Sequence, residues 1–332
     1  MRKLKVAQIG TSETAHSAHI MRAILNMPDV YEMVGFANVD YHPSGVIDPI
    51  FSTVPEMSAE EILNLPLDAV FIETDEALQT SYAMMAANRG LNISMDKPGS
   101  QNDAEFDALI DKVKANGTVF WVNYMYRYNP AVMYAYEKIR NGDIGEVICV
   151  EGQMNTYHGE WLQNRYAGLK GGVMNYLGCH MVDIIYSVLG EPVEVVPFNI
   201  NTRTNNSPAC DFGMAVLRYN NGASIAKVNA VEVAGAPMRR SLVFSGTKGT
   251  LEIRPIERPV GNGLDVTEIY ENYIVDNSSY RKTFPPYGRY TYMLSEFASV
   301  VRGEIKQRYS YEYERGLHKL ILKTCGVNDV KY

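Results

Sequence analysis

Residues 4–15 read LKVAQIGTSETA, and this stretch decides the fold of the first third of the chain. Residues 4–9 form a short, mostly apolar run that ends at Gly10, which predicts a buried strand followed by a tight turn. Apolar residues at helical spacing follow over residues 15–27. A strand, a turn and a helix in this order predict the start of a β-α-β unit, whose strands lie parallel.

The same alternation continues to about residue 122. Strand-like runs cover 33–39, 68–73, 91–95 and 119–122, and helical segments begin near 58, 78 and 102. Strands that alternate with helices predict right-handed crossovers and a parallel sheet. We therefore expect residues 1–122 to form an α/β domain with a doubly wound, Rossmann-type parallel sheet that binds a dinucleotide.

After Pro130 the pattern changes to longer strand-like stretches joined by short turns. These stretches cover 145–155, 192–203, 210–219, 223–233, 239–253 and 264–275, with helical segments near 130–141, 171–189, 290–302 and 311–325. Consecutive strands with tight turns predict an antiparallel sheet. We expect residues 123–332 to form a second α/β domain with a large, open, mostly antiparallel sheet. Its last helix is a candidate for packing back on the first domain.

Composition and charge exclude several classes of protein. The chain has 332 residues, 46% of them apolar, which is enough for two hydrophobic cores. Its net charge of −7 argues against nucleic acid or an anionic membrane as the main partner. Apolar runs are too short for a membrane span or a signal peptide. The four cysteines are far apart and form neither a metal-binding pattern nor a disulfide framework, which favours the cytoplasm.

The turn after the first strand is an incomplete dinucleotide-binding loop. The usual pattern is G-x-G-x-x-G, and here Gly10 is kept while Ser12 and Ala15 replace the other two glycines. The Ser12 hydroxyl could donate to a phosphate, and the N–H groups at the helix start could bind an anion. By itself the loop leaves a cofactor site and an ordinary strand–helix turn equally open.

The second strand ends near an acid that could hold a ribose. Asn38 stands at the usual point and Asp40 two residues later. No arginine follows closely to bind a 2′-phosphate, which favours NAD over NADP without excluding NADP.

Two further segments carry chemistry. Lys97 follows the apolar strand over 91–95, at a strand end where α/β sheets bind ligands, although such a lysine can also be a solvated loop charge. Tyr176, His180 and Asp183 share one narrow sector of the helix over 171–189. That face is polar but lacks long charged side chains, which indicates either the wall of a cleft or a buried helix with a satisfied histidine.

Four motifs follow one another along the chain. They are Asp96-Lys97-Pro98, the sequence YRYNP at 126–130, Gly171-Gly172 leading to His180 and Asp183, and GTKGTL at 246–251. In this order and spacing they resemble the Gfo/Idh/MocA oxidoreductase family, named for glucose–fructose oxidoreductase and inositol dehydrogenase. The chain departs from the family pattern at Tyr176, where the family has an aspartate. It departs again at Asp75 and Gln79, where the family has proline and histidine.

The resemblance implies a nicotinamide cofactor, NAD or NADP, and hydride transfer to or from a carbinol carbon of a sugar, polyol or glycoside. It implies His180 as general acid/base, Lys97 as the group that orients the reacting hydroxyl, and Tyr176 in place of the family carboxylate. It also implies a homo-dimer or homo-tetramer formed through the C-terminal sheet. Expected cofactor contacts are Gly10, Ser12, Ala15, Asn38, Asp40, Thr74, Asp96, Lys97 and Pro98. Expected substrate contacts are Lys97, Tyr126, Tyr157, Trp161, Arg165, Tyr176 and His180.

Two other functions stay open. Some relatives use a retained NAD to oxidise, eliminate and re-reduce, which gives net glycoside cleavage; release of a sugar without NADH would identify that reaction. The incomplete glycine loop is also compatible with a non-catalytic dinucleotide sensor, which would bind NAD without turnover.

Overall fold

The computed structural model describes residues 2–43, 45–231 and 240–327. The chain divides into two compact units, one made of Met1–Tyr124 with Tyr290–His318 and the other of Met125–Arg289 with Lys319–Tyr332. The predicted strands over 223–233 and 239–253 include residues 232, 233 and 239, which lie outside the described residues. Within the described ranges, no helix is both long and apolar enough to cross a membrane.

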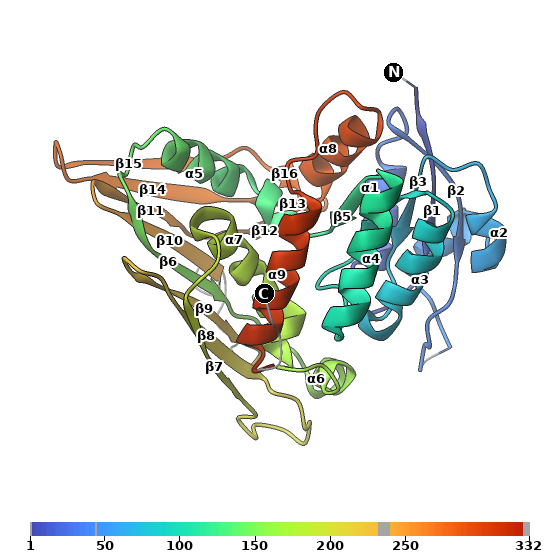
Figure 1. Cartoon of the computed structure of the whole chain (residues 1–332), viewed down its shortest axis with the longest axis horizontal. Coiled ribbons are helices and arrows are strands. Elements are labelled where there is room, and N and C mark those ends of the chain that lie inside the picture. The colour runs from blue at the N-terminus through green and yellow to red at the C-terminus, as the bar shows by residue number, and fades with distance from the viewer. Residues whose placement is uncertain (1, 44, 232–239, 328–332) are drawn as a thin grey trace. The chain divides into compact units, whose positions relative to one another are not determined.

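The first unit contains a five-stranded parallel sheet, which confirms the predicted fold of this part of the chain (Figure 1). The strand order is β2-β1-β3-β4-β5, so the chain moves from β1 to one side and then returns to the other. In open α/β sheets, ligands bind at such a reversal, outside the carboxyl ends of the strands. The strands are β1 (Leu4–Ile9), β2 (Tyr31–Ala37), β3 (Ala69–Ile72), β4 (Asn92–Met95) and β5 (Phe120–Val122).

Helices cover this sheet, and α3 and α4 lie side by side in Figure 1. The helices of the unit are α1 (Ser17–Leu25), α2 (Ala59–Leu63), α3 (Glu76–Asn88), α4 (Asp103–Asn116) and α8 (Thr291–Val301). The buried ring of Phe297 in α8 lies edge-on to Phe71 in β3 at 5.5 Å and to Trp121 in β5 at 5.8 Å. A helix from near the end of the chain therefore belongs to the core of the first unit.

Helix α1 is shorter than the predicted helix over 15–27. The Ser12 hydroxyl accepts hydrogen bonds from the backbone N–H groups of Thr14 at 3.1 Å and Ala15 at 3.3 Å. These bonds fold the start of the predicted helix into a turn, and the helix begins at Ser17.

The second unit contains an eight-stranded, mostly antiparallel sheet, also as predicted. Its order is β15-β14-β11-β10-β6-β9-β8-β7, and β6 and β9 form its parallel pair. In Figure 1 its strands fan out, and α7 packs on β6 and β9. The strands are β6 (Val147–Met154), β7 (Glu194–Ile200), β8 (Phe212–Arg218), β9 (Ala223–Asn229), β10 (Arg240–Gly246), β11 (Gly249–Ile253), β14 (Glu268–Tyr273) and β15 (Ser278–Thr283).

The remaining elements of this unit correct two predictions. The predicted strand over 264–275 is two strands, because the chain leaves a small sheet at Thr267, whose hydroxyl donates to the Pro255 carbonyl at 3.1 Å, and then enters the large sheet. The predicted helix over 171–189 begins later, because Gly171 and Gly172 have φ of +76° and +52°, outside the helical region. The other elements of this unit are α5 (Pro130–Arg140), α6 (Glu160–Tyr166), a π-helical turn (Met174–Gly178), α7 (Cys179–Leu189), β12 (Arg258–Gly261), β13 (Leu264–Val266) and β16 (Tyr287–Gly288). Helix α9 (Tyr311–Thr324) begins in the first unit and ends in the second.

A buried ion pair fixes α7 inside the second unit. Arg127 and Asp183 are 1% and 0% exposed. The Arg127 Nε lies 2.9 Å from both carboxylate oxygens, and one terminal nitrogen lies 2.8 Å from Oδ1. A buried pair contributes little net stability by itself, but removal of one partner leaves an uncompensated charge.

We expect Asp183→Asn to lower the free energy of unfolding by about 3–5 kcal/mol, because it leaves the buried Arg127 guanidinium without its counter-charge. Arg218→Met is the matched control, because the Arg218–Glu194 pair is 56% and 52% exposed. It should change stability by no more than about 1 kcal/mol. Thermal unfolding of the full chain measures the stability of both variants. Equal losses of stability would contradict the conclusion that burial makes the Arg127–Asp183 pair more sensitive to the loss of one partner.

Candidate functional site

Four residues extend the ladder of the five-stranded sheet one step past its carboxyl ends. Backbone N–H groups of Gly10, Glu73, Asp96 and Asn123 donate to carbonyls of the neighbouring strands at 2.8–2.9 Å. We call this set the edge row. Registered residues of parallel strands share one face of the sheet, so the edge row places two acids and an amide together where such sheets bind ligands.

Gly10 is the member of the edge row at which any side chain would force the neighbouring backbone to move. Its φ is +108°, and an added Cβ would lie 2.4 Å from the carbonyl carbon of Glu73 and 2.5 Å from its oxygen. The glycine therefore permits the backbones that follow β1 and β3 to approach closely.

Polar groups of the turn over residues 11–15 are hydrogen-bonded to neighbouring loops of the protein. The buried Ser12 hydroxyl, which caps two backbone N–H groups, also donates to the carboxylate of Asp75. The backbone N–H of Thr11 donates to Asp40 Oδ2 at 2.7 Å, and its hydroxyl donates to Asn38 Oδ1 at 2.7 Å. The structure thus places the predicted residues Ser12, Asn38 and Asp40 around one turn.

The Asp40 carboxylate is held by backbone donors on both oxygens. Its second oxygen accepts from the backbone N–H of Asp75 at 2.7 Å. Burial raises the pKa of Asp40 above its usual value, although the two backbone hydrogen bonds oppose the shift. In this arrangement Asp40 ties the first turn to the loop after β3.

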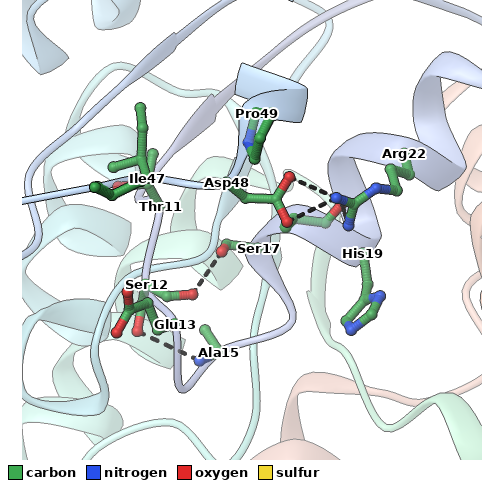
Figure 2. A pocket seen from close by; sticks show the side chains of 12 residues that line it. Thr11, Ser12, Glu13, Ala15, Ser17, His19, Arg22, Ile47, Asp48 and Pro49 are labelled. Atoms are coloured by element: carbon green, nitrogen blue, oxygen red, sulfur yellow. Dashed lines mark hydrogen bonds and ion pairs between the residues drawn. The ribbon is translucent and has the colours of Figure 1, made fainter. Parts of the chain in front are cut away.

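A pocket of about 420 Å³ lies against this turn (Figure 2). At one side of the pocket, Arg22 Nη2 lies 2.6 Å from Asp48 Oδ2. A second pocket of about 250 Å³ shares residues 47–49 with the first. The first pocket is lined by Thr11, Ser12, Glu13, Ala15, Ser17, Ala18, His19, Arg22, Val46, Ile47, Asp48 and Pro49.

The lining fits part of a dinucleotide. Apolar residues 46 and 47 could contact a base, and the Arg22 cation beside Asp48 is the positive charge of the lining that could meet a phosphate. The Thr11 and Ser12 hydroxyls already donate to Asn38 and Asp75, so toward a ribose they offer only acceptor oxygens. Gly10, Ser12 and Ala15 are in or beside this turn, whereas Asn38 and Asp40 do not line the pocket.

Lys97 lies directly after β4 and is 2% exposed. Its carbonyl accepts from Gln79 Nε2 at 3.3 Å, and the same nitrogen lies 3.4 Å from the carbonyl of Thr74. The carbonyl of Pro98 accepts from the Tyr124 hydroxyl at 3.4 Å. Gln79, which stands where the motif pattern has a histidine, therefore joins the loops after β3 and β4.

Side chains beyond the predicted set also hold this loop. His318 Nε2 lies 2.8 Å from the carbonyl of Ser100, and its ring stacks on Phe106 at 4.1 Å. No sequence signal identified His318, because it lies more than two hundred residues away from the loop that it contacts.

Three acidic side chains, those of Glu73, Glu76 and Asp96, interact electrostatically with Lys97. Burial raises the pKa of Glu73 well above its usual value, and Asp96 adds to the shift. Burial also raises the pKa of Glu76. Burial alone would raise the pKa of Asp96 too, but His16 and Lys97 outweigh it, and the pKa of Asp96 is lowered. Sequence reasoning missed His16, Glu73 and Glu76.

His180 lies in the second unit and is 1% exposed. The ring of Tyr126 lies edge-on to it, with ring centres 4.9 Å apart. The Tyr126 hydroxyl accepts from Arg240 at 2.7 Å, and Arg240 also pairs with Glu257. Burial raises the pKa of Tyr126. Tyr126 is therefore a buried neighbour of His180 with a fixed hydroxyl.

Tyr176 belongs to an aromatic cluster in the same unit. It stacks on Tyr166 at 5.1 Å, and His158 lies edge-on to Tyr176 at 5.7 Å and to Tyr166 at 5.8 Å. Tyr157 and Trp161 are 61% and 53% exposed. These ring contacts thus involve His158 and Tyr166, the sequence neighbours of predicted Tyr157 and Arg165.

Within the described residues, no group of three or more His, Cys, Asp or Glu side chains could hold a metal ion.

Sequence comparison covers both halves of the chain. Residues 4–124 match the oxidoreductase family with an NAD-binding Rossmann fold, and residues 132–252 match the GFO/IDH/MocA C-terminal domain. D-xylose 1-dehydrogenase (NADP(+)) 2 of Haloferax volcanii is 26% identical over 71% of this chain and 70% of its own length. The scyllo-inositol 2-dehydrogenase (NAD(+)) of Bacillus subtilis is 26% identical over 58% of this chain and 57% of its own length.

Solved structures show the same fold. The aldose-aldose oxidoreductase of Caulobacter crescentus superposes with a TM-score of 0.79 at 17% identity, covering 98% of this chain and 97% of that one. At that identity the likeness establishes the fold alone.

We expect Gly10→Ala to destabilise the chain by about 2–4 kcal/mol, because its Cβ overlaps the backbone of Glu73 and its φ is unfavourable for alanine. Gly90→Ala is the matched control, with a φ of +70° and open space around the added Cβ. It should cost only about 1 kcal/mol. Thermal unfolding compares the two, and a similar loss in both would show that backbone strain alone is responsible.

Proposed function

Since the chain belongs to the Gfo/Idh/MocA family of oxidoreductases, whose first domain is an NAD-binding Rossmann fold, we propose that it transfers a hydride between a nicotinamide cofactor and a CH–OH or keto carbon of a sugar, polyol or glycoside. The substrates named for its relatives include xylose and scyllo-inositol, which are polyhydroxylated. The observation that carries the proposal is the burial of Lys97 at the carboxyl end of β4, in a loop held by hydrogen bonds.

The cofactor, when bound, supplies the hydride acceptor or donor at its nicotinamide ring. The residues proposed to hold it are those of the first turn and of the loops after β2, β3 and β4: Gly10, Ser12, Ala15, Asn38, Asp40, Thr74, Asp96, Lys97 and Pro98. We propose NAD rather than NADP, because Glu13 and Asp40 place carboxylates beside the first turn. A 2′-phosphate near them would meet like charge.

Lys97 is proposed to donate a hydrogen bond to the reacting oxygen. An ammonium group in a buried site stabilises negative charge that develops on that oxygen far better than it would in water. Asp96 precedes it in the chain, and the positive charge of Lys97 helps to lower the pKa of that carboxyl.

His180 is proposed as the general acid/base. Imidazole has an ordinary pKa near 6.5, which suits proton transfer at neutral pH. Tyr176 would act as a hydrogen-bond donor, since an ordinary tyrosine pKa of about 10 keeps it protonated. Tyr126, Tyr157, Trp161 and Arg165 stay proposed substrate contacts.

We propose that the chain forms a homo-dimer or homo-tetramer through its large sheet. Val196, Phe198 and Ile200 of the edge strand β7 are 39%, 46% and 54% exposed. Such a row of apolar side chains suits an interface between copies. A cytoplasmic location is proposed because the four cysteines, all within the described residues, form no disulfide.

We expect Lys97→Met and His180→Ala each to lower kcat by about 10²–10⁴-fold, because each removes a group that acts on the reacting hydroxyl. NAD affinity, measured by calorimetry, should change little. Lys114→Met, at a 57% exposed surface pair with Glu312, is the control and should keep full turnover.

The assay follows NADH formation over a panel of sugars, polyols and glycosides. Near-normal turnover in either active-site variant would refute its role. Sugar release without NADH would indicate glycoside cleavage, and NAD binding without any turnover would indicate a sensor.

A further inference from the structure

The edge row contains two fully buried carboxyl groups on neighbouring strands. Glu73 and Asp96 are both 0% exposed. They follow Ile72 of β3 and Met95 of β4, which are paired in register, and the N–H of Asp96 donates to the Ile72 carbonyl at 2.9 Å. Because registered residues of parallel strands project to the same face, the two carboxyl groups lie on one side of the sheet.

Each carboxyl group has one oxygen with a clear partner. Glu73 Oε1 accepts from Asn123 Nδ2 at 2.8 Å, and Asn123 Oδ1 accepts from the Ser94 hydroxyl at 2.8 Å. Asp96 Oδ1 lies 2.8 Å from His16 Nδ1. This chain of contacts fixes both acids from the two sides of the pair.

The other oxygen of each acid is the unusual feature. Glu73 Oε2 and Asp96 Oδ2 are buried, and the described residues offer neither of them a hydrogen-bond donor. Two adjacent carboxylates, both ionised and each with a bare oxygen, would be costly in a buried site. A proton on one acid removes the repulsion and supplies the missing donor.

We propose that Glu73 keeps its proton at neutral pH and donates a hydrogen bond to Asp96, so that Glu73 is a positioning residue for Asp96 and for the adjoining Lys97. The opposite pKa shifts of the two acids support this division, because burial and Asp96 raise the pKa of Glu73 while His16 and Lys97 lower that of Asp96. Pairs of interacting carboxyls in enzyme sites divide their protons in the same way.

Burial and the negative charge of Asp96 favour a neutral Glu73. The positive charge of Lys97 opposes it, since it lowers the pKa of Glu73, but the net shift is upward. The charged groups that act on the Glu73–Asp96 pair are His16 before α1 and Lys97 after β4, and Asp96 in turn acts on Glu76 at the start of α3.

The consequence for catalysis rests on the proposed function. With Glu73 neutral, Asp96 and Glu76 are the remaining buried acids near Lys97. An ionised Glu73 would add a further negative charge that attracts the ammonium group and competes with a substrate hydroxyl for it. The protonated acid thus keeps Lys97 available to the reacting oxygen.

The direct test is infrared difference spectroscopy of the full chain at neutral pH. We expect the wild type to show the carbonyl stretch of a protonated carboxylic acid, and Glu73→Gln to lose it. Glu271→Gln is the control, since Glu271 is a buried acid of the second unit that accepts from Tyr134 and Tyr273 hydroxyls. It should leave the Glu73 band in place. A spectrum without a protonated-acid band that depends on Glu73 would overturn the proposal.

Thermal unfolding against pH gives a second measurement. An acid whose pKa is raised by folding takes up a proton on folding once the pH exceeds its unfolded pKa, so its contribution to stability falls as pH rises. We expect the melting temperature of the wild type to fall relative to Glu73→Gln as the pH rises above the ordinary glutamate pKa of about 4.3. A constant difference would contradict the proposal.

Enzyme kinetics separates this proposal from the proposed function. If the chain is a dehydrogenase, ionisation of Glu73 should lower kcat at alkaline pH. This fall in the pH profile of kcat should disappear in Glu73→Gln. An unchanged fall would exclude the positioning role. If no substrate turns over, the proposed function fails, while the infrared and stability results still decide whether Glu73 holds the proton.

Discussion

The close approach of Gly10 to Glu73 is the contact on which the candidate site of the first unit depends. A side chain at position 10 would overlap the backbone that follows β3. Because position 10 carries no side chain, the loops after β1, β3 and β4 can lie in one row. The Asp40 carboxylate joins the loops after β1 and β3, since it accepts from the backbone N–H groups of Thr11 and Asp75. The positions of Asp96 and Lys97 follow from this alignment, because both continue directly from β4.

Much of the fold follows from the sequence, because the alternation of strand and helix is a local property. The run LKVAQIG predicts β1, and the strand-rich second half predicts the antiparallel sheet. Strand ends are less predictable, since they depend on contacts made elsewhere. Thr267 ends one strand by bonding to the Pro255 carbonyl, and the start of α1 is displaced by bonds to the Ser12 hydroxyl.

The residue types of the site can be predicted better than their partners. Ser12, Asn38 and Asp40 stand where a dinucleotide loop needs polar groups. In the structure their side chains form hydrogen bonds that join the first turn to the loops after β2 and β3. Glu73 ends the run DAVFIE and looks like an ordinary polar strand end in the sequence. Its burial comes from long-range packing, and its partner Asn123 lies in a different strand connection. Local patterns carry no information about such pairs.

The first unit is assembled from two distant pieces of the chain, Met1–Tyr124 and Tyr290–His318. A ribosome delivers the five parallel strands early, at roughly 5–20 residues per second, and releases α8 only after Met125–Arg289 of the second unit has been made. Until then the surfaces of Phe71 and Trp121 that Phe297 covers have no native cover. The nascent chain therefore exposes aromatic surface for several seconds or longer before its native cover is synthesised.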